Sequence, residues 1–230
     1  MNASTVEVRS AATALLITDA DPGIEVLMVR RRPRGFFGGL MVFPGGAVDP
    51  EDESPLAAEV VTGDHPDLAL RVAALREVAE ETGIALTPSG LRAAPVGRGR
   101  LLLEALARQS VTLDASALTL VSRWVTPEYA PKRFDTRFYL ARADLAPPVR
   151  LDLDELVTHH WIRPDDALRM VEAGEWDMFL PTVAHLRWLA RRDDVEDAIA
   201  SAAGADGRTL IEPRILEDGS IVPVHLPAEP

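Results

Sequence analysis

Three glutamates on one predicted helix, Glu77, Glu80 and Glu81, are the residues of this sequence best suited to do chemistry. At about 100° per residue, offsets of three and four return to the same side of a helix, so the three carboxylates share an arc. Arg76 can pair with Glu80 one turn on, but it neutralises only part of their charge. A hard divalent cation would neutralise the rest, because Mg²⁺ prefers oxygen ligands. A merely solvated, glutamate-rich helix face is the alternative that these residues alone leave open.

The helix that carries the glutamates is predicted to begin at about residue 68. Its apolar side chains fall on the opposite arc and would bury in a core. Gly83 follows the last charged turn, where a left-handed residue commonly ends a helix. The apolar positions are Leu68, Val72, Leu75, Val78 and Ala79.

A glycine turn upstream of this helix supplies a second element for the same site. Phe43-Pro44-Gly45-Gly46 predicts a tight turn in which bare backbone can approach an ion or a ligand. A backbone carbonyl of the turn and the carboxylates of the helix would then offer oxygens to a cation from two directions.

Together the two stretches resemble the signature of the Nudix hydrolases. Phe43-Pro44-Gly45-Gly46 is followed by Arg76-Glu77-Val78-Ala79-Glu80-Glu81-Thr82-Gly83-Ile84, which matches the second half of the signature at every fixed position. The resemblance implies an α/β/α sandwich with a mixed β-sheet, followed here by C-terminal helices and an extended tail. It also implies metal-dependent hydrolysis of a nucleoside diphosphate linked to another moiety.

The resemblance further implies roles for individual residues. Glu77, Glu80 and Glu81, with the carbonyl of Gly46, would hold Mg²⁺ or Mn²⁺, and Arg76 would orient the carboxylates rather than contact the substrate. The general base would be a helix glutamate, Glu77 or Glu80 among them. The other candidate base is Glu155, which lies in the loop before Trp161, with Asp154 as its rival.

The spacing of the two halves departs from the family pattern. Gly46 and Arg76 are farther apart than the signature has them, and Leu68 stands where the pattern usually has a Glu. The extra residues, roughly 50–66, are rich in Asp, Glu, Gly and Pro and are predicted to form an inserted loop. A branch of the family resembling the peroxisomal coenzyme A diphosphatases carries an insertion at this point, which makes coenzyme A or an acyl-coenzyme A an expected substrate.

Arginines are the expected contacts for substrate phosphates, because a planar guanidinium suits phosphate oxygens. Arg32 and Arg34 belong to a basic run after a predicted strand, and Arg133 begins a run, Arg-Phe-Asp-Thr-Arg-Phe, that also resembles the diphosphatase branch. The alternatives are that these arginines solvate a strand end and that the run is plain strand alternation. The segment 34–38 lacks a Leu-Arg and His pattern that marks some coenzyme A hydrolases.

Composition limits the class of protein. The chain has 230 residues, 47% of them hydrophobic, which predicts one domain with a core at 1–165 and a helical extension and tail at 166–230. It has no cysteine, which excludes disulfides and thiolate sites and fits a cytoplasmic protein. The net charge of −12 argues against broad nucleic-acid binding. No apolar run is long enough to span a membrane.

The remaining sequence predicts the elements that must position these residues. Segments 11–18 and 24–29 predict a hairpin, and residues 84–86, 124–128, 133–141 and 161–162 predict further strands. Helices are predicted at 101–108, from 164, at 181–190 and at 195–203.

The apolar helices near the C-terminus lead us to expect a homodimer. The expected ligand is a small nucleotide-type substrate. A non-catalytic, nucleotide-sensing Nudix module is the alternative function.

Overall fold

The structure, a computed structural model, describes residues 6–34, 38–128 and 130–213. Its centre is a mixed sheet with the strand order β11-β2-β1-β10-β9-β12, in which β3 also pairs with β2 and β4 also pairs with β1. The pairs β1–β10 and β9–β12 are parallel, and the other pairs are antiparallel. The strands of this sheet are β1 (Val8–Asp19), β2 (Ile24–Arg31), β3 (Met41–Val42), β4 (Gly45–Ala47), β9 (Thr119–Val125), β10 (Arg133–Arg142), β11 (Leu156–Ile162) and β12 (Leu210–Ile211).

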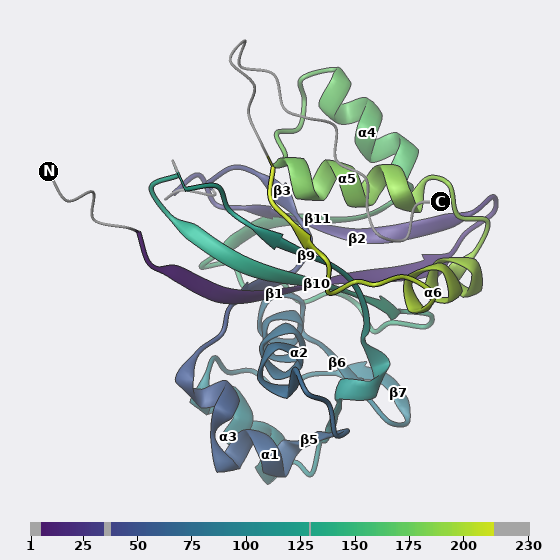
Figure 1. Ribbon diagram of the computed structural model, residues 1–230. Helices are drawn as coiled ribbons and strands as arrows, with labels where there is room; N and C mark the ends of the chain where they lie inside the picture. Colours follow the sequence, from purple (N-terminus) through teal and green to yellow (C-terminus); the bar gives the residue numbers. More distant parts are fainter. Residues whose placement is uncertain (1–5, 35–37, 129, 214–230) are drawn as a thin grey trace, which may run out of the picture.

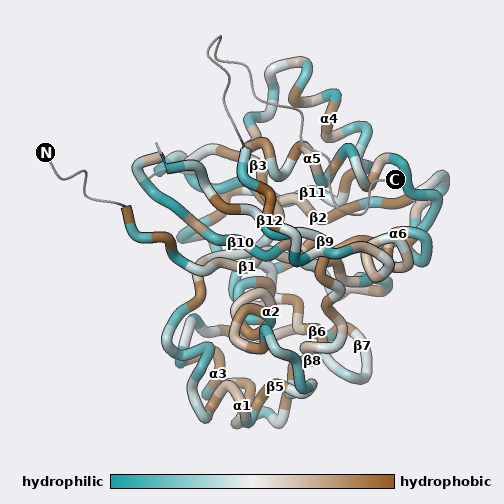
Figure 2. Tube along the Cα trace, in the orientation of Figure 1, coloured by the Kyte–Doolittle hydropathy of each residue, from teal (hydrophilic) through white to brown (hydrophobic). Residues whose placement is uncertain are grey.

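Helices cover both faces of the sheet, so the fold is the predicted α/β/α sandwich (Figure 1). One face packs against α2, with α1 and α3 beyond it, and the other packs against α4, α5 and α6. In Figure 2 the flanking helices carry hydrophobic stretches, whereas many of the outer loops are hydrophilic. The helices are α1 (Pro55–Val60), α2 (Leu68–Thr82), α3 (Arg100–Arg108), α4 (Pro164–Glu172), α5 (Leu180–Leu189) and α6 (Val195–Ala203). In the described ranges, no helix is both long and apolar enough to cross a membrane.

The predicted hairpin is confirmed, and its first strand brings the glycine turn to the sheet. β1 pairs with β2 only over its last residues, where Ile17 lies opposite Val26. Nearer its start, β1 pairs with β4 instead, with Ala12 opposite Gly46. This register places the glycine turn on the face of the sheet that α2 covers.

The helix α2 is buried on nearly every side. It contains no Gly or Pro and is rich in Ala, Leu, Glu and Arg, which are strong helix formers. Gly83 ends it in the left-handed region, with φ of 70°, as predicted. The arc that carries the glutamates is covered as well: Arg76 is 1% exposed and Glu81 2% exposed. The polar arc therefore faces other parts of the protein rather than bulk solvent.

The prediction that residues 50–66 form a loop is wrong. The segment contains the 3₁₀ helix η1 (Pro50–Glu53), the helix α1 and the strand β5 (Val61–Thr62), which pairs with β8 (Leu113–Asp114). Its composition is typical of a loop, but a Pro at the first helical position and Ser54 accepting a hydrogen bond from the Ala57 N–H are helix-start features. Val60 and Val61 then join the core cluster beneath α2.

The helices α3, α5 and α6 lie where they were predicted. A second short sheet, β6 (Ile84–Thr87) with β7 (Gly90–Ala93), follows α2, and the 3₁₀ helix η2 (Ala115–Ala117) precedes β9. The predicted extended tail is described as far as residue 213 and adds β12 to the sheet. Its remainder lies outside the described residues.

A buried histidine holds α5 to the sheet. His185 is 0% exposed and stacks on Phe138, with ring centroids 4.3 Å apart. Its Nδ1 lies 2.6 Å from the Pro181 carbonyl, which can only accept, so Nδ1 carries the proton and Nε2 accepts from the Ser122 hydroxyl at 2.8 Å. Burial lowers the pKa of His185 from 6.5 to about 4, because the charged form would lose its hydration.

This histidine should make the protein less stable in acid. Its folded-state pKa lies below the unfolded value, so the unfolded chain takes up the proton first, and stability is lost as pH falls from about 6.5 to about 4. The loss from this residue amounts to roughly 3 kcal/mol over that range. Urea unfolding of the wild type and of His185→Gln at pH 7, 6 and 5 measures it. Parallel pH dependence of the two proteins would contradict the prediction.

Candidate active site

The structure brings the glycine turn and the acidic helix together. The Gly45 N–H donates to Glu81 Oε2 at 3.0 Å, and a Cβ at position 46 would lie 2.5 Å from Glu77 Cδ. A Cβ at position 45 would meet the backbone carbonyl oxygen of Ala12 at 2.5 Å. The two glycines are therefore needed for different reasons: Gly45 lets β4 approach β1, and Gly46 leaves space for a glutamate.

Arg76 connects two of the glutamates to this turn. Its Nη1 donates to Glu77 Oε1 at 2.9 Å and to Glu80 Oε1 at 3.3 Å, and its Nη2 donates to the Ala47 carbonyl at 3.1 Å. Burial alone would lower the pKa of this guanidinium, but the hydrogen bond with Asp52 and the nearby carboxylates raise it, so Arg76 stays charged. This arrangement supports the predicted orienting role, which itself stays a prediction.

Each of the three glutamates also has a different backbone neighbour. Glu77 lies against Gly46, Glu81 against Gly45, and Glu80 accepts from the Gly99 N–H at 2.6 Å in the loop before α3. In the described part of the chain, no three His, Asp or Glu side chains converge in an arrangement that could hold a metal ion as they stand. The predicted metal roles of Gly46, Glu77, Glu80 and Glu81 stay predictions.

The donors nevertheless suit a hard divalent cation chemically. Burial raises the pKa of Glu77 to about 7, against the opposing charge of Arg76, and burial raises that of Glu81 to about 8, against the opposing charge of Arg31. The ionised forms of the two glutamates are therefore disfavoured in the protein alone, and a nearby cation would favour them. Carboxylate and carbonyl oxygens are the ligands that Mg²⁺ and Mn²⁺ prefer, so this set of donors fits such an ion.

Arg31 is a site residue that the sequence did not single out. Its Nη2 donates to the Gly45 carbonyl at 2.7 Å and to Glu81 Oε1 at 3.1 Å, and its Nη1 lies 3.6 Å from Glu155 Oε2. Strand alternation could have found it, because Leu27, four residues earlier on β2, points into the core on the same face. Its neighbour Arg30 instead donates to the Glu175 carbonyl.

The loop before β11 reaches this group through Glu155. Besides Arg31, Glu155 pairs with Arg98, whose Nη1 lies 3.2 Å from Glu155 Oε1. The rival Asp154 is 91% exposed and lies 3.7 Å from Arg98, away from the helix glutamates. The geometry thus favours Glu155 over Asp154, and it adds Arg98, which the sequence did not indicate, to the surroundings of the site.

Two of the three predicted substrate arginines donate to backbone carbonyls rather than to the glutamates of α2. Arg32 donates through Nε to the Leu153 carbonyl at 2.6 Å, and Arg34 is exposed. Arg133 donates to the Thr126 carbonyl at 3.0 Å at the start of β10. Among the described residues, none of the three makes a hydrogen bond or ion pair with the glutamates of α2, and their substrate roles stay predictions.

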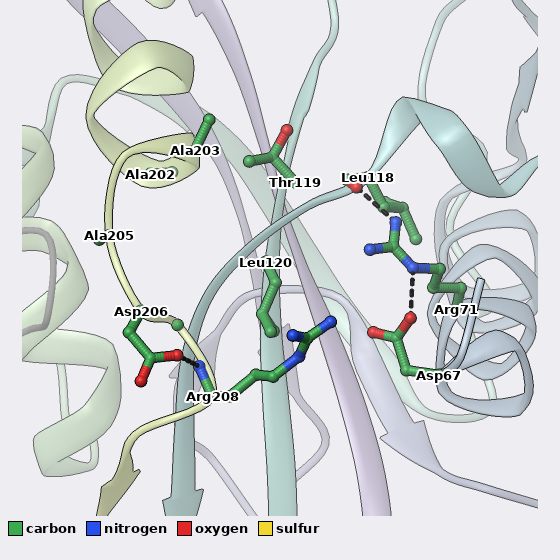
Figure 3. Close-up of a pocket in the computed structure, with 11 residues that line it drawn as sticks. Asp67, Arg71, Leu118, Thr119, Leu120, Ala202, Ala203, Ala205, Asp206 and Arg208 are labelled. Atoms are coloured by element: carbon green, nitrogen blue, oxygen red, sulfur yellow. Dashed lines mark hydrogen bonds and ion pairs between the residues drawn. The ribbon is translucent and has the colours of Figure 1, made fainter.

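A cavity of about 300 Å³ lies elsewhere, at the start of α2 (Figure 3). Asp67 and Arg71 line it on one side and the segment from Ala202 to Arg208 on the other. The two charged residues of α2 are already paired, with Arg71 Nε 2.8 Å from Asp67 Oδ1. None of the residues predicted for catalysis lines this cavity.

No protein-family model matches the chain. The crystal structure of a NUDIX hydrolase from Alicyclobacillus acidocaldarius superposes with a TM-score of 0.73 at 34% identity, over 85% of this chain and 96% of that one. The NUDIX domain of Shewanella oneidensis NrtR, at 17% identity and a TM-score of 0.50, shares the fold.

Two curated proteins are also similar. Nudix hydrolase 7 of Caenorhabditis elegans is 31% identical over 195 residues, which are 81% of this chain and 62% of that protein. The human acyl-coenzyme A diphosphatase NUDT19 is 28% identical over 235 residues, which cover 76% of this chain and 63% of that protein. The chain thus spans less than two thirds of the length of these relatives.

The fold and the site first define a class: an α/β/α sandwich in which one helix presents glutamates and an arginine to a glycine turn of the sheet. Within that class, the match over nearly the whole of the Alicyclobacillus structure decides the family. The chain belongs to the Nudix hydrolase family.

Proposed function

We propose that this protein hydrolyses a diphosphate bond in a nucleoside diphosphate linked to another moiety, with Mg²⁺ or Mn²⁺ as cofactor. The observation that carries the proposal is the contact of Glu77 with Gly46, held by the buried Arg76. A diphosphate repels nucleophiles because it is negatively charged, so hydrolysis needs a group that neutralises charge and aims water. Buried carboxylates beside bare backbone provide the place for such a group.

Each residue then has a defined task. Glu77, Glu80 and Glu81, with the Gly46 carbonyl, would hold the ion, which when bound neutralises phosphoryl oxygens and acidifies water. Arg76 keeps the carboxylates oriented. A helix glutamate accepts the proton of the attacking water, with Glu155 as the second candidate base. The contacts to substrate phosphates come from Arg32, Arg34 and Arg133.

Coenzyme A or an acyl-coenzyme A is the substrate that we favour. The similarity to a human acyl-coenzyme A diphosphatase supports it, as does the insertion between the halves of the signature. The NrtR domain was crystallised with ADP ribose, which makes ADP-ribose-like compounds the next candidates. The alternative is a nucleotide-sensing module without catalysis. Retention of Glu77, Glu80 and Glu81 argues against it, because a sensor does not need all three.

The test is a substrate panel read by mass spectrometry. Purified protein with Mg²⁺ or Mn²⁺ is incubated with coenzyme A, acyl-coenzyme A, ADP-ribose, NADH, dinucleoside polyphosphates and nucleoside triphosphates in H₂¹⁸O, with EDTA and Glu81→Gln as blanks. Cleavage that both blanks abolish supports the proposal, and the labelled product shows which phosphorus is attacked. Nucleotide binding without cleavage of any compound would favour the sensing module.

Replacing Arg31 should slow the same reaction, whereas replacing its neighbour Arg30 should not. Arg31→Lys keeps the charge but cannot contact Gly45, Glu81 and Glu155 together, because an ammonium lacks the planar fork of a guanidinium. We expect kcat/KM to fall about tenfold or more. Steady-state kinetics measures it, with Arg30→Lys as the matched control on the other face of β2. Equal rates for the two variants would refute the role of Arg31.

A further inference from the structure

The turn Gly97-Arg98-Gly99, which leads into α3, contacts the acidic end of α2. The Gly99 N–H donates to Glu80 Oε1 at 2.6 Å. Gly99 has φ of 48°, in the left-handed region where glycine is favoured. A Cβ at position 97 would lie 2.7 Å from the Leu102 amide nitrogen. The two glycines therefore let the backbone turn tightly between Glu80 and α3.

The side chain of Arg98 pairs with the carboxylates of the neighbouring loop, residues 150–155. Its Nη1 lies 3.2 Å from Glu155 Oε1, and its Nη2 pairs with Asp152 and lies 3.7 Å from Asp154 Oδ2. The Arg98 side chain is 43% exposed, and exposed ion pairs contribute little to stability. Replacing Arg98 should therefore leave the fold intact.

Glu155 is held from two sides. Its Oε1 faces Arg98, whereas its Oε2 lies 3.6 Å from Arg31 Nη1. Arg31 also donates to Glu81 Oε1 at 3.1 Å, so one guanidinium bridges Glu155 and the acidic helix. A glutamate that is 43% exposed would otherwise sample several rotamers, and the negative charge of Glu81 would repel it. The two arginines oppose both effects.

Arg98 joins two segments that are each anchored. Its own carbonyl accepts from the Leu101 N–H at 3.0 Å, in the first turn of α3. The 150–155 loop is anchored to the end of α2, where the Asp152 N–H donates to the Glu81 carbonyl at 3.1 Å. The guanidinium of Arg98 is thus a defined point against which a loop carboxylate can be set.

We propose that Arg98 is a positioning residue of the active site, which holds Glu155 beside the helix glutamates while the adjoining Gly99 N–H holds Glu80. The inference rests on the proposed function, in which Glu155 is the second candidate base, and it requires Glu155 to take part in turnover. One three-residue turn then sets both Glu155 and a helix glutamate. Loss of the guanidinium should slow turnover without weakening substrate binding, because Arg98 acts through Glu155.

The test compares Arg98→Gln with Arg100→Gln, which makes the same charge change two residues away. Arg100 is 73% exposed and pairs with Glu104 on its own helix. We expect Arg98→Gln to lower kcat by about 10- to 100-fold, with KM changed by no more than about threefold. A double variant with Glu155→Gln should be no slower than the slower single variant, because both changes act on one carboxylate. Arg100→Gln should match the wild type.

Chemical rescue gives a readout that a purely structural role would not move. Because the Arg98 side chain is partly open to solvent, free guanidinium at a non-denaturing concentration should restore part of the turnover of Arg98→Ala. It should not restore the turnover of Glu155→Gln, which lacks the carboxylate to be held. Equal effects of guanidinium on the two variants would overturn the inference.

The kinetic outcomes separate the inference from the proposed function. Wild-type turnover by either Arg98→Gln or Glu155→Gln, or a raised KM with unchanged kcat in Arg98→Gln, would overturn the inference alone. Losses that add in the double variant would do the same, because Arg98 would then act apart from Glu155. A wild type that cleaves no compound would overturn the proposed function itself.

A second variant covers the case in which Arg98→Gln does not unfold cooperatively. Arg98→Lys then replaces it, and a lowered kcat is expected again, because an ammonium keeps the charge but lacks the planar fork that pairs with Asp152 and Glu155 together. A folded Arg98→Lys with wild-type kcat would likewise overturn the inference.

Discussion

Replacing Glu77 by Gln is expected to lower kcat/KM for diphosphate hydrolysis by about 10²- to 10⁴-fold. Gln has the same shape and can still accept from Arg76 Nη1, so the packing against Gly46 persists. What is lost is the negative charge that would hold a divalent ion beside the scissile phosphates. Steady-state kinetics at saturating Mg²⁺, on the compound that the panel identifies, measures the loss.

The same substitution should not destabilise the metal-free protein. Burial raises the pKa of Glu77 to about 7, from an ordinary 4.5, so ionised Glu77 is disfavoured in the folded state and stability falls as pH rises through about 7. A neutral Gln removes this cost, and Tm at pH 8 without metal should equal or exceed that of the wild type.

Glu104→Gln serves as control for this prediction, since Glu104 lies on α3 and pairs with Arg100 rather than with the site. We expect this variant to keep wild-type kinetics. If Glu77→Gln retained a large part of the wild-type rate, the assignment of Glu77 would be wrong. If it lost both the rate and the fold, Glu77 would be a structural residue.

Local patterns were sufficient to predict the elements of the site. The 3.6-residue repeat of α2, its end at Gly83, the glycine turn and the first hairpin each depend on residues close together in the sequence. The family signature then paired the turn with the helix across the insertion. The fold could be predicted for the same reason, because the signature implies the sandwich.

The partners of the charged groups could not be predicted. Arg31 and Asp52 meet Glu81 and Arg76 through contacts between separate elements, which depend on strand register and on packing of the insertion. The composition of the insertion predicts a loop, because Asp, Glu, Gly and Pro are typical of loops, although Pro and Ser also begin helices. The basic run by itself points to Arg32 as readily as to Arg31, and only the alternation along β2 shows that Arg31 faces inward.

The residue pattern of α2 also does not show whether its acidic arc is exposed or buried. A helix with an apolar arc and an acidic arc ordinarily shows the acidic arc to water. Here β4 covers Glu77 and Glu81, and the loop at Gly99 covers Glu80. Burial of this arc raises the pKa values of all three glutamates, a property that only the tertiary structure creates.

Gly46→Ala should abolish most activity while leaving the fold intact. Gly46 is not among the glycines with positive φ, so its backbone suits alanine. The added Cβ would lie 2.5 Å from Glu77 Cδ, and the atoms it meets are the end of that side chain. The carboxylate should therefore swing away, at a cost in stability within about 1 kcal/mol. A displacement of about 1 Å in a catalytic group can lower the rate about 100-fold, and we expect at least that loss in kcat.

Gly204→Ala is the matched control, because a Cβ there makes only an ordinary contact, 3.4 Å from the Ala200 carbonyl oxygen. Urea unfolding and turnover should separate the two variants: similar stability in both, with turnover lost only in Gly46→Ala. The double variant Gly46→Ala/Glu77→Gln sharpens the test, because two changes that act on one carboxylate should not be additive. Its rate should equal that of the slower single variant. Additive losses would mean that Gly46 acts through its own backbone rather than through the space it leaves for Glu77.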